Sequence, residues 1–274
     1  MLRLLSIEYF KLRNTRFFWA LIILFALILI AIPFGIRGFV LYLDSIGDKG
    51  PLNAFGLRPI DIPLFDFVDL WQNLTWVYNF FSLFLGFIAI ISIGNEYTYG
   101  TIKQNIIDGL SRQELFWSKV YFMGALSLGI SLLVLLIGLI AGFLWSPVTE
   151  WQFVVHHIEF IPAYAFHLLA FQLFCLTVSL WIKRTGIVMA LITFYVYGVE
   201  KIFQGLIRWE LEMPALAQFL PARATEMLIP NPFPKYVLQE TITTVPWQGF
   251  LITAGAALLY GFLSYRMLTK RDLN

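Results

Sequence analysis

Long apolar segments divide the chain into six candidate membrane spans. Each reaches about the 20 residues that a helix needs to cross the hydrocarbon core of a bilayer. Runs such as 21–32 do not alternate apolar and polar residues, which argues against the strands of an outer-membrane barrel. We therefore expect an all-α, polytopic integral membrane protein whose six spans are Phe17–Ile36, Trp76–Ile93, Phe116–Trp145, Ile161–Ile182, Gly186–Leu206 and Trp247–Leu268.

The composition agrees with one transmembrane domain over residues 1–274. Hydrophobic residues make up 59% of the chain and charged residues 13%, against about 25% charged in soluble domains. A net charge of +2 gives no reason to expect a nucleic-acid partner. The single cysteine, Cys175, excludes an internal disulfide.

Basic residues indicate the orientation of the spans. Twelve of the 19 Lys and Arg residues fall on the side that holds both termini, if six spans are counted. Because basic residues accumulate in cytoplasmic segments, we expect an N-in/C-in topology. Leu2, Leu5, Tyr9 and Leu12 share a face at helical spacing, which predicts an interfacial helix over residues 1–15.

Two long segments, 37–75 and 207–246, then lie outside the cell and are rich in Gly and Pro. Within the second, Leu216–Leu220 and Ala224–Ile229 are apolar but too short to span. They are either re-entrant helices before the last span or parts of a structured loop.

The cytoplasmic segment 94–115 contains capping patterns. Thr101 with Gln104 three residues later predicts a capping box at the start of a short helix over Ile102–Asp108. Gly109 suits the left-handed position that ends a helix. Ser111 with Glu114 predicts a second capping box, which opens the third span.

Such a short helix between two spans lies along the cytoplasmic face. Ile102 and Ile106 are four residues apart and share one side of it. The segment is therefore either a docking element for a partner or a loop helix with no partner.

This segment resembles the cytoplasmic signature of ABC-2 type transporter permeases, the membrane subunits of bacterial ATP-driven exporters. The resemblance covers about 25 residues by motif and most of the chain by architecture. It is carried by Glu96, Gly100-Thr101, the amphipathic stretch that follows, Gly109, Ser111-Arg112 and Lys119.

The resemblance implies that this chain lies in the bacterial cytoplasmic (inner) membrane and that its short helix is a coupling helix, seated in a groove of a separate ATP-binding subunit. It also implies a second permease copy, with the translocation path formed by the pair. The implied ATPase interface consists of Glu96, Gly100, Thr101, Ile102, Lys103, Gln104, Asn105, Ile106, Ile107, Asp108, Gly109, Ser111 and Arg112.

No G-x-x-x-x-G-K-[ST] phosphate loop occurs in the chain. We therefore expect no cofactor here, with ATP and Mg bound by the partner ATPase, and no catalytic residue. Packing and interfacial roles suit His156, His157 and His167 better than a metal site. The alternatives are a non-transporting scaffold, such as an assembly or immunity subunit, and an intramembrane enzyme.

Glu200 and Lys201 are charged residues within the fifth span, near its outer end. Charges within a membrane are functional candidates. Glu200 either lines an outer vestibule or pairs with a neighbouring helix. Gly138 and Gly142 form a G-x-x-x-G pattern in the third span, which indicates close helix packing within the chain or at a homodimer seam.

Overall fold

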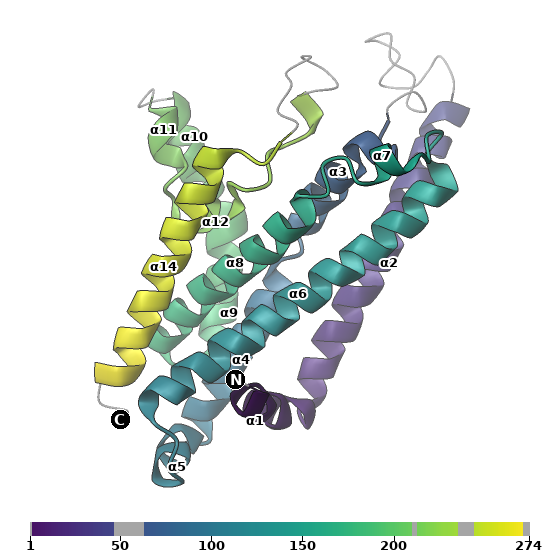
Figure 1. Cartoon of the computed structure of the whole chain (residues 1–274). Coiled ribbons are helices and arrows are strands. Elements are labelled where there is room, and N and C mark those ends of the chain that lie inside the picture. The colour runs from purple at the N-terminus through teal and green to yellow at the C-terminus, as the bar shows by residue number, and fades with distance from the viewer. Residues whose placement is uncertain (1, 47–62, 210–212, 235–243, 271–274) are drawn as a thin grey trace.

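The computed structural model describes residues 2–46, 63–209, 213–234 and 244–270 (Figure 1). Within these ranges all regular elements are helices, as the apolar pattern predicts. Among the described residues, five helical runs are long and apolar enough to cross a membrane. They are α2 (Arg16–Ser45), α6 (Arg112–Trp145), α8 (Phe160–Ile182), the run Thr185–Arg208 and α14 (Trp247–Lys270).

The predicted second span is not one straight helix. It consists of α3 (Phe67–Asn79) and α4 (Leu83–Thr98), which are bent by 47° at a short break. The carbonyl of Tyr78 accepts hydrogen bonds from the N–H of Phe81 and the hydroxyl of Tyr164, and this tightens the chain into a turn. Counted as one bent span, the pair brings the total to six.

The predicted start at Trp76 is wrong, because this residue lies inside α3. α3 begins nine residues earlier and carries polar side chains, which a search for apolar runs rejects. The fold nevertheless buries these polar side chains, which are Asp69, Gln72, Asn73 and Thr75.

The fifth span is also interrupted. α9 (Thr185–Phe194) passes through a π-helical turn, η4 (Tyr195–Val199), into α10 (Glu200–Trp209). The first span extends further than predicted, because α2 continues past Ile36 to Ser45 with Pro33 inside it. The other spans begin and end within a few residues of their predicted bounds.

α8 is the centre of the bundle and packs against α4, α6 and α14. Two thirds of its most apolar stretch is buried, against 28% in α2. Phe67 and Trp71 of α3 lie against Gly142 and Gly138 of α6. The G-x-x-x-G pattern therefore serves packing within the chain.

One end of the bundle carries α1 (Leu2–Arg13), α5 (Thr101–Ile107) and the last described turn of α14 (Figure 1). The N-terminal helix is thus confirmed as a helix, and it crosses this end of the bundle. The two ends of the described chain lie on this same side (Figure 1).

The opposite end carries α7 (Trp151–Val154), α11 (Pro214–Ala217) and, deeper in the bundle, α12 (Pro221–Glu226). α12 packs against both α8 and α14. The remaining parts of the predicted outer segments, residues 47–62, 210–212 and 235–243, lie outside the described residues.

Candidate functional site

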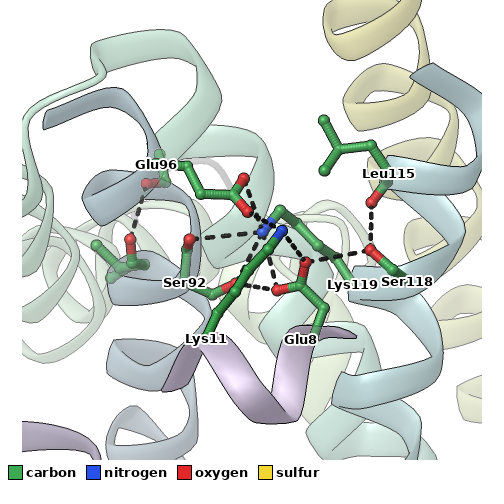
Figure 2. Close-up of polar contacts among 9 residues, drawn as sticks. Glu8, Lys11, Ser92, Glu96, Leu115, Ser118 and Lys119 are labelled. Atoms are coloured by element: carbon green, nitrogen blue, oxygen red, sulfur yellow. Dashed lines mark hydrogen bonds and ion pairs between the residues drawn. The ribbon is translucent and has the colours of Figure 1, made fainter. Parts of the chain in front are cut away.

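Four charged side chains meet where α1 crosses the bundle (Figure 2). We call Glu8 and Lys11 of α1, Glu96 of α4 and Lys119 of α6 the charge cluster. Glu8 and Lys11 are three residues apart, so they project from the same side of α1 toward the other two helices.

Each lysine of the charge cluster contacts both carboxylates. Lys119 Nζ lies 3.2 Å from Glu8 Oε2 and 3.1 Å from Glu96 Oε2. Lys11 Nζ lies 2.7 Å from Glu96 Oε1 and 3.2 Å from Glu8 Oε1. Two positive and two negative charges therefore alternate, and the charge cluster is neutral as a whole.

The charge cluster is buried apart from Lys11. The side chains of Lys119, Glu8 and Glu96 are 0%, 1% and 4% exposed. Ser92 and Ser118 donate hydrogen bonds to the two oxygens of Glu8 at 3.1 and 3.2 Å. Such paired and hydrogen-bonded charges are the form in which ionised groups are tolerated away from water.

Glu8 is ionised in this setting. Burial by itself raises the pKa of a carboxyl, but the ammonium groups of Lys119 and Lys11 and their hydrogen bonds outweigh it and hold the pKa of Glu8 below its ordinary value. The ionised carboxylate of Glu8 thus holds α1 against the spans through its ion pairs.

A polar cavity of about 270 Å³ adjoins the charge cluster between α1, α4 and α5. The amide nitrogen of Asn105 from α5 is buried and has no hydrogen-bond partner among the described residues. The cavity is lined by Glu8, Lys11, Leu12, Thr15, Ser92, Asn95, Glu96, Tyr99, Thr101 and Asn105. It connects the charge cluster directly to the short helix.

Left-handed glycines flank α5 at both ends. Gly100 has φ +65 and Gly109 has φ +98, values that glycine adopts without steric cost. After α5, the N–H of Gly109 donates to the Ile106 carbonyl (3.1 Å) and the N–H of Leu110 to the Asn105 carbonyl (2.9 Å). This paired bonding confirms Gly109 as the residue that ends the helix.

Of the two predicted capping boxes, one is confirmed and one is wrong. Ser111 Oγ accepts from the N–H of Glu114 at 3.2 Å, and Glu114 Oε2 accepts from the N–H of Ser111 at 3.0 Å. Thr101 makes no cap, because it is already the first residue of α5, and Gly100 takes the N-cap position without a side chain.

The two sides of α5 differ sharply. Ile102 is 3% exposed, and Ile106 packs against the same core. Ile107 is 82% exposed, and Tyr99 before the helix is 76% exposed. The shared face of Ile102 and Ile106 is therefore confirmed, but it faces the protein's own core, and the outward side begins at Ile107.

The remaining residues of the predicted interface divide in the same way. Gln104, Asp108, Gly109 and Ser111 are exposed. Arg112 is half-buried and donates to the Thr269 carbonyl of α14 at 3.0 Å. Lys103 belongs to α5, but its side chain lies outside the described part of the structure.

Glu200 lies at the start of α10 and is 1% exposed. Its carboxylate accepts hydrogen bonds from the N–H groups of Ala222 (2.9 Å) and Arg223, which belong to the first turn of α12. Glu200 thus caps the N-terminus of α12, where a negatively charged carboxylate is favourable. Lys201 is half-exposed and lies 3.7 Å from Glu226.

The three histidines are separated between two places. His167 is buried within α8, where its Nδ1 lies 2.7 Å from the Thr225 carbonyl. His156 and His157 lie between α7 and α8, where His157 Nδ1 lies 3.1 Å from Glu159. His167 therefore links α8 to α12, and the other two lie at the surface loop.

Sequence reasoning missed Glu8 and Lys11, and named Lys119 only as part of the resemblance. Two signals were available. A lysine inside a long apolar span requires a partner, and Glu8 lies four residues before Leu12 on the predicted buried face of the N-terminal helix. Neither signal identifies which residue meets which.

The fold and this site define a class, a multi-pass α-helical membrane protein with a surface helix fastened to its spans by buried charges. By comparison with family models, the chain belongs to the family described as "Protein of unknown function (DUF2705)", whose model matches residues 54–274. A search of curated proteins found no match.

Proposed function

We propose that this chain is the permease subunit of an ABC-2 type ATP-driven exporter in the bacterial inner membrane. In this proposal α3 and α4 form one bent span, six spans give an N-in/C-in topology, and two copies form the translocation path. ATP and Mg are bound by separate ATPase subunits, and α5 is the coupling helix that contacts them.

The observation that carries the proposal is the way α5 is held. It joins the end of α4 to the start of α6 through a left-handed glycine on each side. Ile102 anchors it in the core, and the charge cluster fastens α4 and α6 to α1 beside it. A displacement of α5 is therefore expected to move α1, α4 and α6 together.

The exposed side of α5 supplies a docking surface. Tyr99 and Ile107 present large apolar side chains, with the exposed polar residues Gln104 and Asp108 beside them. Apolar side chains ringed by polar ones are typical of protein interfaces. We assign this surface to the groove of the ATPase.

Co-purification from native cells in mild detergent tests the proposal. The tagged chain is expected to retain a subunit with a G-x-x-x-x-G-K-[ST] motif, identified by mass spectrometry, and ATPase activity. Ile107→Asp is expected to lose both, because it charges the exposed apolar contact. Ile46→Asp, at the exposed isoleucine that directly follows α2, is the control.

Gly109→Pro provides a second test of the same helix. Proline cannot adopt a φ near the +98° of Gly109 and removes the N–H that bonds Ile106. This variant is expected to lose the ATPase while the chain still elutes as a folded species. Wild-type chain that is folded but carries no ATPase contradicts the exporter and favours a scaffold.

A further inference from the structure

An apolar groove of about 660 Å³ runs along the outside of the bundle between α6, α8 and α14. In Figure 1, α6 and α14 diverge from the end that carries α5, with α8 between them. Aromatic and aliphatic side chains form its walls, among them Trp117, Val120, Leu173, Leu258 and Phe262.

Small residues of α14 keep this groove open. Ala257 and Gly261 line it, and a Cβ added to Gly261 would meet no atom within 4 Å. The hollow is therefore free space that a larger side chain at position 261 would occupy.

The groove ends in positive charge. Phe262 lines the groove, and the exposed Arg266 follows it one turn further along α14, at the border of the groove. The Arg266 guanidinium carbon lies 5.7 Å from the centre of the Phe262 ring. This end lies beside the start of α6, where Arg112 bonds the Thr269 carbonyl.

We propose that this groove binds an anionic phospholipid, with an acyl chain along the apolar walls and the phosphate against Arg266. Basic pockets between membrane helices are known headgroup sites. An apolar partner helix would fill the walls but would supply no anion for Arg266. The proposal is independent of transport and of which side of the membrane this end faces.

Native mass spectrometry of the purified full chain tests the proposal. It is titrated with phosphatidylglycerol or with phosphatidylcholine of the same acyl chains. The wild type is expected to bind phosphatidylglycerol more tightly, and Arg266→Gln to lose about fivefold in affinity. The control is Arg184→Gln, at an exposed cation away from the groove.

Gly261→Leu tests the apolar part and is expected to weaken binding of both lipids. Its control is Gly129→Leu, an exposed glycine of α6 that also has no atom within 4 Å of an added Cβ. Equal affinity for the two lipids in the wild type overturns the proposal, as do equal losses in the variants and their controls. Release of an accompanying polypeptide by Gly261→Leu overturns it in favour of a protein interface.

Discussion

Lys119→Met tests whether the charge cluster holds the bundle together. The substitution keeps an unbranched side chain of similar length and removes the ammonium group that contacts Glu8 and Glu96 at 3.2 and 3.1 Å. Lys11 then remains alone against two buried carboxylates. Removing one partner of a buried ion pair costs about 3–5 kcal/mol, because the other charge stays buried without compensation.

The assay is the free energy of unfolding of the purified chain in mixed micelles, measured by denaturant titration. We expect the wild type to exceed Lys119→Met by about 3–5 kcal/mol. Lys201→Met is the matched control, since Lys201 is 45% exposed and lies 3.7 Å from Glu226. An ion pair with one solvent-exposed partner and a separation of 3.7 Å is expected to contribute about 1 kcal/mol or less.

A double variant separates charge from packing. Lys119→Met with Glu8→Gln restores a neutral site, with Lys11 against Glu96 at 2.7 Å. The double variant is therefore expected to lose less free energy of unfolding than the two single variants lose together, by about 2 kcal/mol or more. Strictly additive losses, or a loss below about 1 kcal/mol for Lys119→Met, would refute the reasoning.

Three further predictions concern other contacts. Because the pKa of Glu8 is lowered in the folded chain, the stability that its ionised carboxylate contributes is complete above the ordinary carboxyl pKa of about 4.3 and is lost as the pH falls through the folded value. Below about pH 4.3, the free energy of unfolding of the wild type should therefore fall more steeply with acid than that of Glu8→Gln. Glu200→Gln leaves one oxygen for two backbone N–H groups of α12, and should cost about 1–3 kcal/mol with faster amide exchange at Ala222, whereas unchanged exchange contradicts the cap. Gly142→Leu overlaps the Phe67 ring and should cost about 1–3 kcal/mol in thermal or denaturant unfolding, while the open Gly129→Leu should not.

Much of the local structure was predictable because it depends on neighbours in the chain. The apolar runs placed five of the spans, and the Ser111–Glu114 pattern placed the start of α6. Gly109 ended the short helix as its type suggests. The failed box at Thr101 shows the limit of such patterns, since a glycine in the left-handed region took the N-cap position instead.

The break between α3 and α4 was not predictable in the same way. At this break the hydroxyl of Tyr164, 86 residues along the chain, donates a hydrogen bond to the Tyr78 carbonyl. The polar side chains of α3 likewise suggest a loop from the sequence alone, because their hydrogen-bond partners come from distant parts of the fold. Asn73 donates to the Leu64 carbonyl at 3.0 Å and Gln72 to the Pro230 carbonyl at 3.3 Å.

The amino-acid sequence by itself determined the membrane class, most of the spans and the short helix between α4 and α6, because apolar length and capping act within a few residues. Only the tertiary structure decided which face of that helix points outward and which charges meet. Lys11 and Glu96 are separated by 85 residues, and Glu8 and Lys119 by 111. Pairs so distant are selected by packing of the helices in three dimensions, since a buried charge is stable only where the fold brings its partner.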